Sequence, residues 1–483
     1  MNFQVIRRMM GWILLFEALF FLLPTITAIV YREREVFSFL ICIAICLILS
    51  GLCLIKKPSN QSFFAREGFV TTALSWIVLS IFGALPFVIS GATDSFTDAL
   101  FESVSGFTTT GATIFKGTEV DELPRCILMW RSFTHWIGGM GVLVFIMSLL
   151  PLSGAKNMFI MKAESPGPAV GKLVPKVRET ASILYKIYGI LTFILFLLLL
   201  LGDMSPFDAL TTAFSTAGTG GFSNTSNGFS GFSNYSHIVV IIFMILFSIN
   251  FTSFYFVLCG KLKDAITTEV RAFLGIIFVA TLFITLNLRL SDFAAEYSFG
   301  ETLRNAAFSV SSIISTTGFV TVDFNLWPSF SKTILVILMF IGACAGSTGG
   351  GMKVSRFVVL IKGIKHEMSR MLHPNQIKKI SIDGHLVEHE VVRGINTYLA
   401  AYIFVFVFSL LAVSFDKFDL ITNFTAVVTT MNNVGPGLEA VGPVGTFADF
   451  SVLSKLVFIF DMLVGRLEVF PMLMLFSYKT WKK

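Results

Sequence analysis

The sequence repeats one short pattern four times: Thr109-Thr110-Gly111-Ala112, Thr219-Gly220-Gly221-Phe222, Thr316-Thr317-Gly318-Phe319 and Asn433-Val434-Gly435-Pro436. Each copy ends a polar, hydroxyl-rich stretch between two hydrophobic segments, and the third residues of the copies are 110, 97 and 117 residues apart. A single copy would be compatible with a re-entrant turn that only packs helices. Four copies in register, each between segments of membrane length, predict a pore built by one chain with approximate fourfold symmetry.

The composition excludes a soluble globular protein. Of the 483 residues, 54% are hydrophobic and only 14% are charged, whereas soluble domains carry about a quarter charged residues. Apolar runs of roughly 20 residues recur, which is the length that crosses about 30 Å of hydrocarbon. The six cysteines are single and show no metal-binding or disulfide spacing, so we interpret them as small core residues. The chain therefore lies in a lipid bilayer.

The hydropathy pattern predicts an all-α polytopic membrane protein with ten spans. We place them at 9–30, 36–55, 69–90, 126–150, 183–202, 237–259, 273–290, 332–361, 396–415 and 452–478. The first span is too long for a signal-peptide core and lacks a cleavage site, so we expect it to be retained. Eight spans form four parallel span–pore-loop–span repeats beside an N-terminal two-helix unit. The expected units are 1–60, 61–155, 156–262, 263–375 and 376–483.

Basic residues predict the orientation of these spans. With the N-terminus inside, 25 of the 36 Lys and Arg residues fall on the inner side, 10 fall on the outer side, and Arg466 lies within a span. Loops rich in Lys and Arg remain in the cytoplasm. We therefore expect both termini in the cytoplasm and all four glycine hairpins outside. The net charge of +6 follows from this topology and requires no nucleic-acid partner.

Short amphipathic segments precede the hairpins, at 98–105, 208–215, 303–310 and 419–426. Asp98, Asp208 and Asp419 begin three of them, and we expect these aspartates to cap short helices whose negative ends point at the hairpins. Glycine permits positive φ, so carbonyl oxygens can turn toward an axis and replace the hydration shell of a cation. The hairpin tips carry no ring of carboxylates, which favours a dehydrated monovalent cation over calcium. In the second copy Gly218 and Gly220 compete with Gly221, and we choose Gly221 because Gly221-Phe222 mirrors Gly318-Phe319.

This pattern resembles the superfamily of bacterial Trk and Ktr and plant high-affinity potassium transporters. The extra N-terminal pair of spans, the length and the segment 432–437 are most similar to the Trk-type membrane subunit, over essentially the whole chain. The resemblance implies potassium uptake with potassium as the transported ion and no organic cofactor, a homodimer in the bacterial cytoplasmic membrane, and a cytosolic nucleotide-binding regulatory ring. It implies a potassium filter formed by Thr110, Gly111, Gly220, Gly221, Thr317, Gly318, Val434 and Gly435.

The span at 332–361 contains four glycines within six residues, at Gly346, Gly349, Gly350 and Gly351. Each glycine inside a helix costs about 1 kcal/mol relative to alanine, so we expect the helix to unwind there. Such a loop would lie across the pore just inside the filter and act as a gate, and close helix packing through small residues is the alternative. The family resemblance also favours the gate. No strand precedes the glycines, so a phosphate-binding loop is excluded.

Arg466 lies in the last span, together with Asp461 and Glu468. An ionisable residue at membrane depth usually faces a cavity or a partner. Glu468 is only two residues away and does not face Arg466 on a helix. Arg466 therefore either projects into the pore below the filter or forms a structural ion pair with another helix, and the resemblance favours the pore.

We expect no enzymatic activity, because the chain offers no nucleophile, metal cluster or acid–base pair. His385, Glu388 and His389 match a zinc-peptidase spacing, but they lie in a charged inner loop without a third ligand. His135 is interpreted as a packing residue. A sodium- or proton-coupled symporter is the alternative function, but it predicts repeats of alternating orientation, whereas all four hairpins fall on one side.

Overall fold

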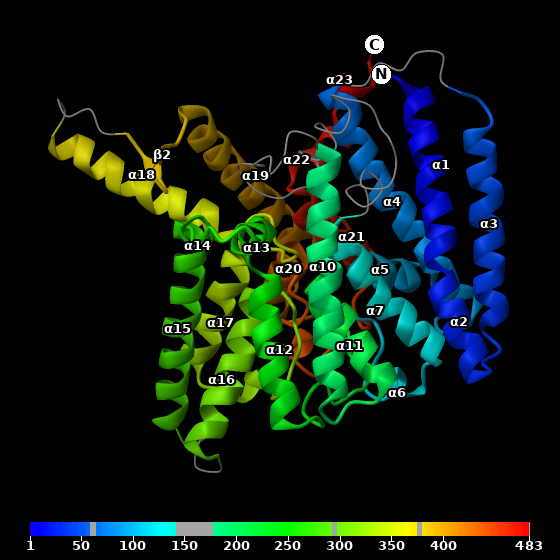
Figure 1. The fold of residues 1–483 in the computed structure, drawn as a ribbon, viewed down its shortest axis with the longest axis horizontal. Helices are drawn as coiled ribbons and strands as arrows, with labels where there is room; N and C mark the ends of the chain where they lie inside the picture. Colours follow the sequence, from blue (N-terminus) through cyan, green and yellow to red (C-terminus); the bar gives the residue numbers. More distant parts are fainter. Residues whose placement is uncertain (58–63, 142–176, 292–296, 374–378, 483) are drawn as a thin grey trace.

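The computed structural model describes residues 1–57, 64–141, 177–291, 297–373 and 379–482. Helices dominate these residues, and the only regular strands among them are β1 (Ser381–Ile382) and β2 (His385–Leu386), which pair antiparallel. The predicted all-α membrane class is confirmed. Both ends of the chain lie at one end of the molecule, and the short helix α6 (Glu119–Glu122) lies at the opposite end (Figure 1).

Six helical segments within the described residues are long and apolar enough to cross a membrane. They are α1 (Phe3–Phe20) with α2 (Leu22–Tyr31), α3 (Val36–Leu54), α4 (Ala65–Ile89), α10 (Val177–Leu200), α15 (Thr268–Arg289) and α19 (His389–Val413). Large apolar side chains cover their outward faces; Phe278 is 70% exposed and Phe404 is 67% exposed. Such faces suit contact with lipid, because a water-facing surface would carry charged side chains.

Two predicted spans are not straight helices. The span at 237–259 consists of α12 (Asn234–Phe247) and α13 (Phe251–Leu258), bent by 94°, and the side chain of Asn250 caps the second helix by accepting from the Thr252 amide. The span at 452–478 begins with α21 (Val452–Leu467) and is then divided into α22 (Phe470–Phe476) and α23 (Tyr478–Trp481). Glu468 and Val469 have positive φ, and Pro471 opens the next helix, so the first helix cannot continue.

Two further predicted spans are not single continuous helices within the described residues. The span at 126–150 is helical as α7 (Arg125–Gly139), and residues 142–150 lie outside the described part. The span at 332–361 is interrupted, as predicted: α17 (Ser329–Ile341) ends before Gly342, and α18 (Val354–Leu372) begins twelve residues later. Three predicted unit boundaries, at 60, 155 and 375, also fall outside the described residues, and the fourth lies within α14 (Leu262–Ala265).

The four short helices predicted before the hairpins are present: α5 (Phe96–Phe107), α11 (Pro206–Gly218), α16 (Phe299–Ile314) and α20 (Leu420–Asn432). We call them the pore helices. Helix α7 packs against both α5 and α11, and α21 packs against both α20 and α5. The first and fourth repeats therefore adjoin each other, although they are far apart in sequence.

The capping residues differ partly from the prediction. Asp419 caps α20, but the caps of α5 and α11 are Ser95 and Ser205, whose hydroxyls accept from the amides of Asp98 and Asp208. A serine hydroxyl can serve as well as an aspartate at this position, and the aspartate in the first turn still suits the helix dipole. The third pore helix begins at Phe299, four residues before the predicted start, with Ser298 and Glu301 forming a capping box.

Candidate functional site

The four pore helices end in one shared backbone motif. In each, a left-handed residue follows the helix, and its amide donates to the carbonyl three residues earlier; the next amide donates to the carbonyl five residues before itself. The left-handed residues are Thr109, Thr219, Thr316 and Asn433, with φ of 56°, 54°, 59° and 54°. Left-handed backbone is unfavourable for residues other than glycine, so its occurrence at four equivalent positions indicates a conformation imposed by the fold.

Two residues further on, each repeat has its glycine. The φ angles are 77° at Gly111, 81° at Gly221, 80° at Gly318 and 97° at Gly435. Gly218 and Gly220 do not have positive φ. The backbone therefore places Gly221 in register with the other three glycines, as the sequence comparison of Gly221-Phe222 with Gly318-Phe319 predicted.

The four glycines form a closed ring. A Cβ atom added to Gly111 would lie 1.9 Å from the carbonyl oxygen of Gly220, and one added to Gly221 would lie 2.0 Å from that of Thr317. A Cβ on Gly318 would lie 2.3 Å from the oxygen of Val434, and one on Gly435 would lie 2.7 Å from the oxygen of Thr110. Each glycine thus touches the carbonyl of the next repeat, and the fourth repeat touches the first. The predicted filter residues are brought together around a single axis.

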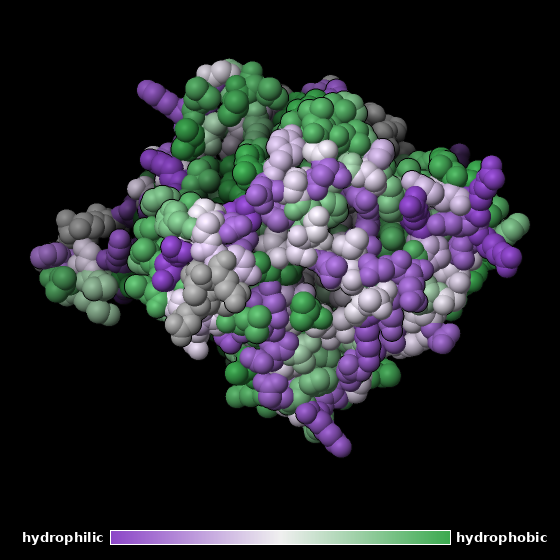
Figure 2. Space-filling model, turned by 90° about the horizontal axis from the view of Figure 1, so that it is seen from below, coloured by the Kyte–Doolittle hydropathy of each residue, from purple (hydrophilic) through white to green (hydrophobic). Residues whose placement is uncertain are grey.

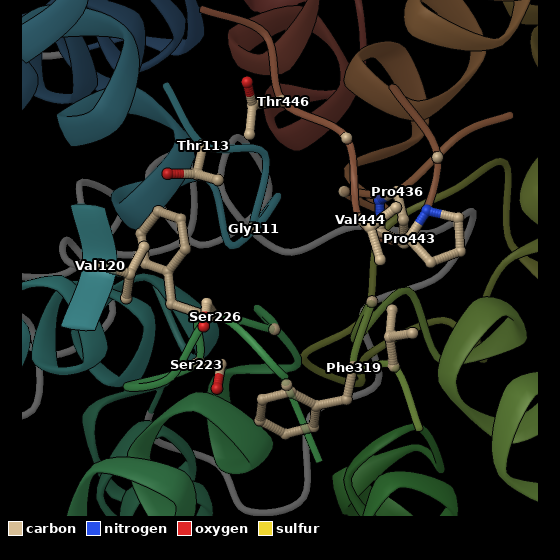
Figure 3. Close-up of a pocket in the computed structure, with 18 of the residues that line it drawn as sticks. Gly111, Thr113, Val120, Ser223, Ser226, Phe319, Pro436, Pro443, Val444 and Thr446 are labelled. Atoms are coloured by element: carbon tan, nitrogen blue, oxygen red, sulfur yellow. The ribbon is translucent and has the colours of Figure 1, made fainter. Parts of the chain in front are cut away.

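A cavity of about 350 Å³ opens above this ring, and we call it the vestibule. All four glycines line it, together with residues that follow them in each repeat. Figure 3 shows Gly111 and Thr113 of the first repeat, Ser223 and Ser226 of the second, Phe319 of the third and Pro436 of the fourth around this common space. Figure 2 views the molecule from the end opposite the termini, and hydrophilic residues extend across the middle of that face.

The glycine-rich loop between α17 and α18 lies against the opposite side of the ring. The Gly350 amide donates to the Thr316 hydroxyl (2.6 Å), and the Thr219 hydroxyl donates to that of Thr348 (3.4 Å). A Cβ on Gly350 would lie 2.5 Å from the carbonyl oxygen of Asn432. The loop therefore contacts the ends of the second, third and fourth pore helices at once.

Arg466 and the glycine-rich loop together form a layer beneath the ring, in which Arg466 lies on the side of the first repeat. Its guanidinium donates to the Thr348 carbonyl (2.7 Å), to the Gly138 and Gly139 carbonyls (2.5 and 2.7 Å) and to the Thr109 hydroxyl (3.3 Å). Helix α7 ends at Gly139, so these carbonyls lie at its C-terminal end and carry partial negative charge. The flat, many-donor guanidinium suits such a set of acceptors. Arg466 thus links the glycine-rich loop to the first pore helix.

Two further residues hold the loop, and the sequence pattern did not single them out. Glu269, on α15, accepts from the amide of Ala345 (2.7 Å), inside the interruption, and from that of Ser355 (3.0 Å), in the first turn of α18. The Lys353 ammonium donates to the Gly349 carbonyl within the loop. Glu269 lies 76 residues before Ala345, so only the tertiary structure brings them together.

A buried ion pair within the first repeat, with a further hydrogen bond to the second repeat, was also missed. Arg131 is 2% exposed and donates to Glu102 (2.8 Å) and to the Ser223 carbonyl (3.2 Å). Glu102 also accepts from the Ile114 amide (3.1 Å). The pair therefore ties the strand after Gly111 to the strand after Gly221.

Other ionisable groups that the sequence singled out have structural contacts. Glu468 pairs with Arg356 of α18, and Asp461 accepts from Ser409 (2.6 Å). His135 is fully buried and stacks on Phe222, as the packing interpretation predicted. Among the described residues, His385, Glu388 and His389 do not form a group with metal-binding spacing; Glu33, Glu35 and Cys126 do, but Glu33 already accepts from the Arg125 and Cys126 amides.

Comparisons with known proteins agree over the whole chain. The TrkH family, described as cation transport protein, matches residues 35–483. The chain is 34% identical to the Trk system potassium uptake protein TrkH of Escherichia coli K12, with 100% of both chains covered, and 32% identical to TrkG of the same organism, with 99% covered. It is also similar to the crystal structure of the potassium transporter TrkH from Vibrio parahaemolyticus, with a TM-score of 0.88, 34% identity and 100% of both chains covered.

Proposed function

Because the chain belongs to the TrkH family of cation transport proteins, we propose that it is a potassium-selective uptake channel or transporter. The observation that carries this proposal is the closed ring of Gly111, Gly221, Gly318 and Gly435. The ring is built by four equivalent backbone turns of one chain and lies at the base of the vestibule. A continuous ring of backbone carbonyls is what a filter for dehydrated cations requires.

The ion would bind to backbone carbonyls along the filter strands. The strands comprise Thr110, Gly111, Gly220, Gly221, Thr317, Gly318, Val434 and Gly435. Four pore helices end directly behind these strands, and the partial negative charge of their C-termini favours a cation there. The fold supplies these dipoles without a charged side chain at the tip, which suits a monovalent ion. Potassium is the transported ion, and we propose no organic cofactor in this chain.

We further propose that both termini lie in the cytoplasm and that the vestibule opens outward in the bacterial cytoplasmic membrane. The distribution of Lys and Arg supports this orientation. Val120 of α6 lines the vestibule, and α6 lies at the end opposite the termini (Figure 1), which supports this orientation. Potassium would then move inward down the membrane potential, since a charge crossing 100 mV gains about 2.3 kcal/mol.

The gate in this proposal is the loop that contains Gly346, Gly349, Gly350 and Gly351, together with Arg466. Contacts of this layer with all four repeats support a position across the conduction path. Arg466 places a positive charge in that path, where repulsion of a cation is poorly screened. The loop is anchored by hydrogen bonds that can be exchanged, whereas a packed helix would have to unfold to open.

A cytosolic nucleotide-binding regulatory ring and a homodimer complete the proposal. The names of the relatives place them in a Trk system. Helix α18 follows the glycine-rich loop directly and carries exposed basic residues, so a partner bound there could pull on the loop. Purified protein examined by light scattering, with and without the regulatory subunit, would test both assemblies.

The alternative function is a sodium- or proton-coupled symporter. Potassium flux into liposomes separates the two, because a channel needs only the potassium gradient or the membrane potential. We expect flux without any sodium or proton gradient. A strict requirement for either co-ion gradient would refute the channel proposal.

A further inference from the structure

The filter strands of the first and third repeats are held from behind by hydroxyl groups. In the first repeat the Ser105 hydroxyl donates to the Ala112 carbonyl (2.6 Å), and Thr108 bonds to Thr110 through their hydroxyls (2.8 Å). The third repeat has the same two bonds, from Ser312 to the Phe319 carbonyl (2.6 Å) and between Ser315 and Thr317 (2.7 Å). These bonds fix the backbone on both sides of the ring glycine.

The second repeat has neither bond. Its equivalent serine, Ser215, has no hydrogen-bond partner for its hydroxyl among the described residues. Glycine replaces both members of the hydroxyl pair, since Gly218 stands in the place of Thr108 and Gly220 in the place of Thr110. The strand that ends at Gly221 must therefore be held in another way.

The side chain of His135, from helix α7 of the first repeat, occupies the vacated space. A Cβ atom on Gly220 would lie 2.3 Å from the imidazole, and one on Gly218 would lie 2.2 Å from the His135 carbonyl oxygen. A side chain at position 220 would collide with the imidazole, and one at position 218 would collide with the main chain of residue 135. This explains why the second copy of the pattern reads Gly-Thr-Gly-Gly, which had made its register ambiguous in the sequence.

His135 also contacts the residue beyond the glycine. Its ring stacks on that of Phe222 with centroids 4.3 Å apart, and the Arg131 guanidinium lies 4.2 Å from the same ring. His135 is fully buried, and neither ring nitrogen has a hydrogen-bond partner among the described residues. His135 therefore positions the second strand by its volume and by ring stacking, whereas hydrogen bonds position the strands of repeats one and three.

We propose that His135 is a positioning residue for the second filter strand and that its size sets the place of the Gly220 carbonyl in the ring. The inference rests on the proposed function, since it assigns an ion-selective role to that ring. The Gly220 carbonyl oxygen lies directly against Gly111, so a shift of the second strand is transmitted to the first. Because His135 packs without a hydrogen bond, the position of this strand depends on the volume of a single side chain.

The test compares His135→Ala with His135→Phe in proteoliposomes, with potassium and sodium fluxes measured for each. Alanine leaves a cavity into which the strand can relax, so we expect the potassium-to-sodium flux ratio to fall about tenfold, equivalent to about 1.4 kcal/mol. Phenylalanine keeps a flat ring in the same place and should retain most of the discrimination. Ser215→Ala is the matched control and should leave the ratio unchanged, whereas Ser312→Ala should lower it.

A rescue experiment distinguishes positioning from a general structural role. Gly220→Ala refills part of the space that the imidazole occupies, so it should damage the wild type but restore part of the discrimination lost in His135→Ala. If His135→Ala does not fold, Gly220→Ala pushes the strand from the other side and should lower the ratio likewise. A folded His135→Ala protein with the wild-type ratio, or an equal effect of Ser215→Ala, would overturn the inference.

Thermal unfolding separates this inference from the proposed function. Gly220→Ala should cost much less stability in the His135→Ala background than in the wild type, because the clashing ring is gone. This coupling does not depend on which ion the protein carries. A wild type that moved no potassium would refute the proposed function, while additive stability effects at positions 135 and 220 would refute the role of His135.

Discussion

Replacing a ring glycine by alanine should damage the proposed filter, and the damage should be larger where the neighbouring repeat lies closer to that glycine. A Cβ on Gly111 would lie 1.9 Å from the Gly220 oxygen, whereas ordinary contact begins at 3.4 Å, so the two strands must separate by about 1.5 Å. Such overpacking typically costs about 1–3 kcal/mol. The positive φ adds about 1–2 kcal/mol for any residue with a Cβ atom. The expected loss of stability for Gly111→Ala is therefore about 2–5 kcal/mol.

Gly91 provides a control that isolates the backbone contribution. Its φ is +76°, nearly the same as at Gly111, but no atom lies within 4 Å of a Cβ added there. Gly91→Ala should thus show only the cost of the positive φ and no change in ion selectivity. Across the ring the clash weakens from Gly111 and Gly221 through Gly318 to Gly435, where the distance is 2.7 Å. The loss of selectivity should follow the same order.

The assay combines thermal unfolding in detergent with potassium and sodium fluxes in proteoliposomes. We expect Gly111→Ala and Gly111→Ser to weaken discrimination between the two ions more than they weaken expression. Two results would contradict this reasoning. One is a folded Gly111→Ser protein with unchanged selectivity, which would place the filter elsewhere. The other is an equal loss of selectivity in Gly91→Ala, which would attribute the effect to general destabilisation.

Three further predictions concern the gate. Arg466→Ala should raise basal potassium flux without changing selectivity. Arg466→Lys keeps the charge but loses the planar guanidinium, so it should raise the flux less. Equal fluxes in the two variants would show that the hydrogen bonds, and not the charge, close the path. Deleting residues 346–351 should also raise basal flux. Its effect should not add to that of Arg466→Ala, because Arg466 donates to the Thr348 carbonyl in that loop. A folded deletion variant with parental flux would favour close packing over gating. Glu269→Ala removes the acceptor of the Ala345 and Ser355 amides, which costs about 1–3 kcal/mol for each amide, and should open the loop. Glu269→Gln should have a smaller effect on the open fraction. Single-channel recordings with an unchanged open fraction would exclude Glu269 as an anchor of the proposed gate.

The sequence by itself determined the architecture, because the features that specify it are local and repeated. Membrane-length apolar runs follow from the thickness of the bilayer, and a glycine after a polar helix end marks a turn that needs positive φ. Four such turns at similar spacing were enough to predict the repeats, the ring glycines and the unwinding of the span at 332–361. The prediction that Asp98 and Asp208 cap α5 and α11 was wrong, because serine and aspartate serve equally well at that position and Ser95 and Ser205 take it.

Only the tertiary structure decided which distant groups meet at the site. Glu269 meets the glycine-rich loop and the first turn of α18, and Arg466 meets the end of α7, through contacts that no local pattern encodes. The second filter strand is another example. Gly220 was visible in the sequence, but the His135 ring that leaves no room for a side chain there lies 85 residues earlier, in another repeat. Spacing along the chain specifies helices and turns, whereas the volume shared between neighbouring repeats exists only once they have packed into a ring.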